Sequence, residues 1–152
     1  MRLNYREVLP EASKAMLGLE RVANSGLADP RLLNLIKIRA SQINGCSYCL
    51  RLHADEARER GETNERLDMV AAWREADCFG QAERAALAWC EAVTLLPDSG
   101  APDDLYGELL RHFTSQQVVA LAIVAINGRN RLNVGFRTPV AGAGTVAQPE
   151  AA

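Results

Sequence analysis

The stretch Leu35-Ile-Lys-Ile-Arg-Ala-Ser-Gln-Ile-Asn-Gly-Cys-Ser-Tyr-Cys-Leu-Arg-Leu-His53 decides the fold, because it joins two helical patterns across one tight break. Before it, Asp29-Pro30 offers an N-cap followed by a proline at the first helical position. Apolar residues then recur at helical spacing as far as Asn44-Gly45. A second helical segment follows over about 46–60. The stretch therefore predicts two consecutive helices, with Cys46 at the opening of the second.

The rest of the chain also shows helical periodicity, without sustained alternation or β-branched enrichment and without a fixed repeat. Residues 1–139 are predicted to form a single all-α domain, a helical bundle, and the small-residue segment 140–152 a flexible tail. The other expected elements in the first half are a helix over 10–24 with Gly26 as left-handed cap and a helix from Thr63 through Trp73. A break at Cys78-Phe79-Gly80 precedes a further helix whose apolar side runs from Leu87 to Leu95, and a loop follows at 97–100. A short helix after Pro102 and a long final helix from Thr114 to about Arg131 complete the expected elements.

Composition excludes several classes of protein. The chain has 152 residues, 48% hydrophobic and 24% charged, which is ordinary for one globular domain. The formal net charge of −2 leaves no basic stripe for nucleic acid. The N-terminus lacks a secretory apolar stretch, and the longest apolar run, Val118–Ile126, is far shorter than the roughly 20 residues that span a bilayer. We expect a cytoplasmic protein without nucleic-acid or membrane partners.

Three residues carry the chemistry. Cys46, Cys49 and His53 are spaced i, i+3, i+7, which places them on one face of a helix. Backbone N–H groups and the helix dipole stabilise a thiolate at a helix start, and a Cys-x-x-Cys pair can close a disulfide. A histidine one turn further along can relay the thiol proton. The stripe predicts peroxide reduction or dithiol exchange.

Competing interpretations of these and other polar residues are weaker. A zinc site is disfavoured because no second ligand pair completes it, so no metal or other cofactor is expected. The remaining cysteines, Cys78 and Cys90, are interpreted as core residues, and His112 as a group at a helix end. Glu56 either orients His53 or is an exposed helix glutamate, the second being favoured.

The chain resembles the alkylhydroperoxidase AhpD-like branch of the carboxymuconolactone decarboxylase superfamily. The resemblance rests on 35–53 and its continuation over 54–61, and it extends to Ala82-Glu-Arg-Ala-Ala-Leu87 and Asn130-Arg-Leu-Asn-Val-Gly-Phe-Arg-Thr-Pro139. It implies an all-helical subunit that forms trimers or hexamers and reduces a small hydroperoxide at the expense of a thiol reductant. Wide apolar arcs on several helices also suggest a homo-oligomer.

The resemblance assigns roles to the stripe. It implies that Cys49 forms the sulfenic acid, Cys46 is its proton donor and disulfide partner, and His53 is the relay. Helix physics alone favours Cys46 as the more reactive thiol. Two positions depart from the family pattern, because Asn34 stands where a relay glutamate is expected and Tyr48 where a histidine is expected.

The leading hypothesis is thus an antioxidant peroxidase-type oxidoreductase. Asn34 motivates an alternative, a non-catalytic redox sensor or switch that uses the same dithiol. Lactone decarboxylation is a third and less favoured hypothesis, because that chemistry does not require a Cys-x-x-Cys pair. A further polar stretch, Asn127-Gly-Arg-Asn130, lines either a subunit interface or the pocket.

Overall fold

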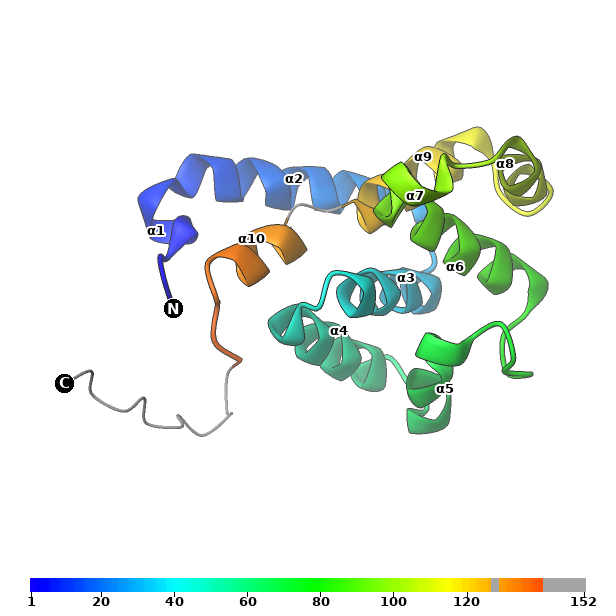
Figure 1. The fold of residues 1–152 in the computed structure, drawn as a ribbon, viewed down its shortest axis with the longest axis horizontal. Helices are drawn as coiled ribbons and strands as arrows, with labels where there is room; N and C mark the ends of the chain where they lie inside the picture. The colour runs from blue at the N-terminus through cyan, green and yellow to red at the C-terminus, as the bar shows by residue number, and fades with distance from the viewer. Residues whose placement is uncertain (127–128, 141–152) are drawn as a thin grey trace.

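Helix α3 (Pro30–Ile43) lies at the centre of the computed structural model, which describes residues 1–126 and 129–140 (Figure 1). The other long helices contact it: α2 (Pro10–Leu27), α4 (Ser47–Glu59), α6 (Gln81–Thr94) and α9 (Ser115–Ala125). No strand occurs in these residues, so the predicted all-α bundle is confirmed. In the same part of the chain, no helix is both long and apolar enough to cross a membrane.

Shorter elements complete the bundle. They are α1 (Tyr5–Val8), α5 (Asn64–Met69), a 3-10 turn (Val70–Ala72), α7 (Leu96–Ser99), α8 (Asp103–Leu110) and α10 (Arg129–Gly135). Helix α10 contacts α4, and the segment before α1 is tied to the end of α10 by the Arg2 N–H, which donates to the Phe136 carbonyl at 2.8 Å. The N-terminal segment and the last described helix therefore meet near the start of α4.

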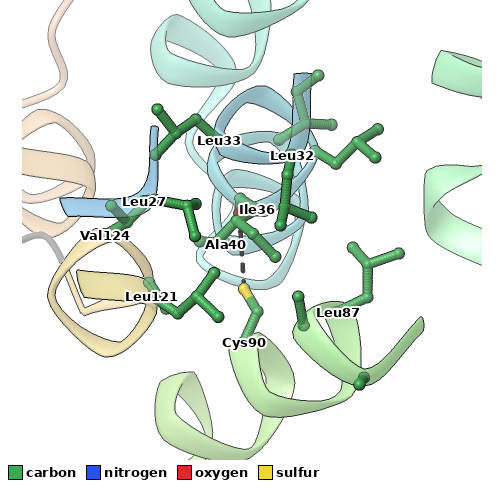
Figure 2. Packing of buried hydrophobic residues seen from close by; sticks show 14 of the residues in the cluster. Leu27, Leu32, Leu33, Ile36, Ala40, Leu87, Cys90, Leu121 and Val124 are labelled. Atoms are coloured by element: carbon green, nitrogen blue, oxygen red, sulfur yellow. Dashed lines mark hydrogen bonds between the residues drawn. The ribbon is translucent and has the colours of Figure 1, made fainter. Parts of the chain in front are cut away.

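The core surrounds α3 because this helix is apolar on more than one side. Ile36 of α3 and Leu87 of α6 are fully buried. Leu27 of α2 and Leu121 of α9 are only 2% and 1% exposed. Figure 2 shows these side chains converging, with the Cys90 thiol directed at the Ile36 carbonyl oxygen at 3.5 Å. Cys90 is thus a core residue, as its apolar neighbours in the sequence predicted.

Local capping explains where the main helices begin. The Asp29 side chain accepts hydrogen bonds from the backbone N–H groups of Arg31 and Leu32 at 3.0 and 3.1 Å, which confirms the predicted cap of α3. Thr114 and Gln117 form the predicted capping box of α9. Thr63 likewise caps α5. These side chains satisfy backbone donors that a helix start leaves unpaired.

The predicted end of the first long helix was wrong. Helix α2 runs through Gly26 to Leu27, and Ala28 with φ of 57° supplies the left-handed cap. Gly26 serves packing, since a Cβ at this position would lie 3.3 Å from the Cβ of Ala120. The glycine lets α2 and α9 approach closely, so its structural role is in a tertiary contact and not in ending the helix.

Three other boundaries also differ from the predictions. The expected loop at 97–100 overlaps the helical turn Leu96–Ser99, and α1 was not predicted. The expected final helix is two elements, because α9 ends at Ala125 and α10 begins at Arg129. The predicted flexible tail lies outside the described residues, apart from Val140.

Candidate active site

The two motif cysteines sit at the first turn of α4. Gly45, with φ of 64°, makes the left-handed turn that separates α3 from α4. Cys46 is the N-cap residue, and its sulfur accepts the backbone N–H of Cys49 at 3.3 Å. A disulfide joins the two residues, whose Cα atoms are 5.3 Å apart. Both side chains are buried, so the disulfide is protected from bulk solvent at the positive end of the helix dipole.

His53 lies one turn after Cys49 on the same helix and is also buried. Its Nδ1 is 3.0 Å from Oε2 of Glu56, and because a carboxylate only accepts, the ring donates from Nδ1. This hydrogen bond from His53 is the main cause that lowers the pKa of Glu56 below its usual value. With Nδ1 directed at Glu56, Nε2 is the ring nitrogen available to exchange a proton with a thiol.

The favoured interpretation of Glu56 as a merely exposed glutamate was therefore wrong. Its side chain is one-third exposed and orients His53 from one turn away. Asn34, at the position where the family resemblance expects a glutamate, is buried, and its Oδ1 accepts from the Arg60 guanidinium at 2.8 Å. The carboxylate beside His53 thus comes from α4 itself and not from α3.

We expect the substitution Glu56→Gln to slow oxidation of the reduced dithiol by hydroperoxide about tenfold, because a charge-assisted hydrogen bond to His53 becomes a neutral one. Stopped-flow fluorescence of the reduced protein mixed with peroxide would measure this rate. Glu59→Gln, an exposed neighbour on the same helix, is the matched control and should leave the rate unchanged. Equal rates for the wild type and Glu56→Gln would show that the carboxylate has no part in the relay.

Tyr48, the second departure from the family pattern, contacts the N-terminal segment. The Arg6 guanidinium donates to the Tyr48 hydroxyl at 3.3 Å and lies 5.3 Å from the centre of its ring. The hydrogen bond to Tyr48 is the largest cause that raises the pKa of Arg6. Tyr48 therefore links α4 to the N-terminal segment.

Asn133 of α10 is a site residue that the sequence analysis missed. It is buried, and its Nδ2 lies 3.2 Å from the sulfur of Cys49, 84 positions away in the chain. The Tyr5 hydroxyl and the Thr138 hydroxyl donate to its Oδ1 at 3.0 and 3.1 Å. Asn133 falls inside the stretch 130–139 that resembles the family. The presence of a polar residue in that stretch is the signal in the sequence that points to Asn133 as a site residue.

Two cavities open on the dithiol. One of about 250 Å³ is lined by Cys46, Tyr48 and Asn133, together with the end of α10. A second of about 10 Å³, close to the room of one water molecule, lies between Cys49 and His53. Arg129 and Asn130 line this second cavity, so the part of the polar stretch 127–130 that the structure describes faces the site. The three predicted site residues therefore share one locality.

The other thiols and His112 lie away from this locality. Burial raises the pKa of Cys90 to about 12, and Cys78 is a partly buried free thiol. His112 follows the end of α8, and its Nε2 lies 3.2 Å from Glu108. Among residues 1–126 and 129–140, no group of three or more His, Cys, Asp or Glu side chains could hold a metal ion.

A buried Cys-x-x-Cys at a helix start, served by a histidine, defines an all-α dithiol protein whose cysteine pair fits a redox role. The sequence model of the carboxymuconolactone decarboxylase family matches residues 10–92. The chain belongs to this family, in its AhpD-like branch.

Two known proteins are similar to the chain over most of its length. The uncharacterised protein YdfG of Bacillus subtilis is 37% identical over 137 residues, which are 89% of this chain and 93% of YdfG. A crystal structure of ATU0492 from Agrobacterium tumefaciens superposes with a TM-score of 0.86 at 40% identity, covering 91% of this chain and 97% of that one. ATU0492 is of unknown function and has been provisionally assigned as the antioxidant defence protein AhpD.

The debrominase Bmp8 shares the fold at greater distance. Its TM-score is 0.76 at 24% identity, covering 88% of this chain and 73% of Bmp8. At this identity the likeness concerns the fold alone.

Proposed function

We propose that the protein is a thiol-dependent peroxidase of the alkylhydroperoxidase type, with an antioxidant role. The observation that carries the proposal is the arrangement of one dithiol at the first turn of α4 with a histidine oriented by a carboxylate from the same helix. Such a site combines a stabilised thiolate, a resolving thiol and a proton relay within two helical turns.

The reaction begins on the reduced dithiol. The Cys49 thiolate attacks the terminal oxygen of a hydroperoxide, the O–O bond breaks, and the leaving alkoxide takes a proton through His53 to become an alcohol. Cys49 is then a sulfenic acid. The Cys46 thiol gives up its proton and attacks the Cys49 sulfur, the S–S bond forms as the S–O bond breaks, and the departing hydroxide takes a proton and leaves as water. A thiol reductant returns two electrons and restores both thiols.

We also propose that the working form is a homo-oligomer, a trimer or a hexamer. Large apolar side chains are exposed on neighbouring elements at the N-terminal end: Val8, Leu9, Leu19 and Val22, which are 63, 60, 53 and 70% exposed. A monomer rarely leaves such a group uncovered. Light scattering coupled to size-exclusion chromatography should give three or six times the subunit mass of 16.6 kDa, and a monomeric mass would contradict oligomerisation.

Steady-state turnover of tert-butyl hydroperoxide with dithiothreitol as reductant tests the activity. We expect catalytic consumption of peroxide by the wild type, and markedly slower turnover in Cys46→Ser, because its sulfenic acid is no longer resolved within the chain and must be attacked directly by dithiothreitol. Dimedone should trap that sulfenic acid on Cys49, and Cys78→Ser should behave as the wild type.

The outcomes separate the two candidate functions. If the wild type forms the disulfide but turns over no faster than the reductant alone, the dithiol is a sensor and the peroxidase proposal fails. The second function is favoured by one observation: position 34 holds Asn34, a buried amide bound to Arg60, in place of the expected carboxylate.

A further inference from the structure

We propose that the side-chain amide of Asn133 is a catalytic hydrogen-bond donor that stabilises the Cys49 thiolate, and that Tyr5 and Thr138 are the residues that position it. The proposal rests on the proposed function, since it assigns a partner to the sulfur that reacts there. It brings α10 and the N-terminal segment into a site whose predicted residues, Cys46, Cys49 and His53, belong to α4 and its N-cap.

The orientation of the amide follows from its neighbours. Two hydroxyl groups converge on Oδ1, from Tyr5 at 3.0 Å and Thr138 at 3.1 Å. The Tyr5 oxygen also accepts from Nε of Arg6 at 3.4 Å, so its own proton is directed to Asn133. With Oδ1 engaged in this way, Nδ2 faces the Cys49 sulfur at 3.2 Å.

The backbone and rings around Tyr5 hold this network in place. The Arg2 guanidinium donates to the Gly135 carbonyl at 3.2 Å, and the rings of Tyr5 and Phe136 are 6.0 Å apart. Because these contacts join the N-terminal segment to the end of α10, they fix Tyr5 against Asn133. The Arg6 guanidinium adds a positive charge at the outer end of the hydrogen-bonded chain.

A donor at this place has a clear consequence for the thiol. Cys49 is only 3% exposed, so its thiolate receives little hydration and needs partners from the protein. Cys90, buried to a similar extent, shows the effect of burial, which raises the pKa of that thiol to about 12. A hydrogen bond from an amide N–H stabilises a thiolate more than a neutral thiol. It therefore offsets part of the desolvation cost of the charged form of Cys49.

Other groups also face Cys49 and must be held constant in a test. Tyr48, His53 and Arg129 line the small cavity next to it, and Cys46 is its disulfide partner. Substitutions at Asn133 and Tyr5 leave all four of these side chains in the chain.

The test measures the pKa of Cys49 in the fully reduced protein. The rate of alkylation by iodoacetamide is followed as a function of pH, and fragment-ion mass spectrometry separates Cys49 from Cys46, Cys78 and Cys90. In Asn133→Leu we expect the pKa of Cys49 to rise by about 1, so that alkylation at neutral pH slows about tenfold. Asn133→Asp, which replaces the donor with a carboxylate, should raise it further. Tyr5→Phe should give a smaller rise, and Tyr106→Phe, a remote tyrosine, should give none.

An unchanged pKa of Cys49 in both Asn133→Asp and Tyr5→Phe would overturn the proposal. These two variants nearly preserve side-chain volume, so they still test the role of Asn133 if Asn133→Leu does not fold. Alkylation needs no hydroperoxide. A wild type without peroxidase turnover would therefore refute the proposed function while the assignment of Asn133 was still decided by these rates.

Discussion

Replacing Cys49 with serine is expected to abolish the reaction with hydroperoxide. Serine keeps the size of the side chain but is not a thiolate at neutral pH, so no nucleophile remains at the position that Asn133 and His53 serve. No sulfenic acid forms there, no disulfide can follow, and turnover should fall to the rate of the reductant alone. Consumption of tert-butyl hydroperoxide under saturating dithiothreitol measures the loss.

Matched substitutions of the free cysteines are the controls for Cys49→Ser. Cys78→Ser and Cys90→Ser each remove one thiol away from the dithiol and should retain turnover, provided that the variant remains folded by circular dichroism. If Cys49→Ser kept a substantial fraction of the activity while Cys46→Ser lost it, the roles of the two motif cysteines would be reversed. Their order would then follow the helix-start argument, which favours Cys46.

Replacing Ile36 with alanine is expected to produce a large loss of stability. Ile36 is fully buried on α3, the helix that α2, α4, α6 and α9 all contact. Truncation removes apolar contacts and leaves a cavity that the surrounding helices can only partly close, at a cost of about 2–5 kcal/mol. Since typical domains are stable by only about 5–15 kcal/mol, this is a sizeable fraction of the total.

Urea denaturation followed by circular dichroism would measure the effect of Ile36→Ala. Val119→Ala on α9 is the control, because Val119 is 60% exposed and its truncation should cost little in the subunit. A change of less than about 1 kcal/mol for Ile36→Ala would mean that α3 is not the packed centre of the bundle.

The elements around the motif could be predicted from the sequence because their determinants are local. Asp29 and Pro30 specify the start of α3, and Gly45 ends the pattern immediately before the cysteine pair. The stripe of Cys46, Cys49 and His53 follows from the helical period alone. Residues a few positions apart on one helix necessarily share a face, so a periodic pattern is enough to place them together.

What could not be predicted depends on contacts between distant segments. Asn133 and Tyr5 reach the site from opposite ends of the described chain, and no periodicity relates them to Cys49. The sequence predicts a cap at Gly26 because glycine is common at helix ends, whereas in the structure its lack of a side chain permits the contact with Ala120. The spacing of Glu56 from His53 also fits an exposed helix surface, so the helical period alone does not predict the hydrogen bond between them.

Titration of the reduced protein with hydroperoxide, with mass-spectrometric mapping of every thiol, tests the central claim most directly. One equivalent of tert-butyl hydroperoxide should convert Cys46 and Cys49 into a disulfide, with the loss of two thiols per peroxide, while Cys78 and Cys90 remain free. If Cys46 and Cys49 both stay reduced after exposure to peroxide, the dithiol does not react with hydroperoxides and the protein is not a thiol peroxidase.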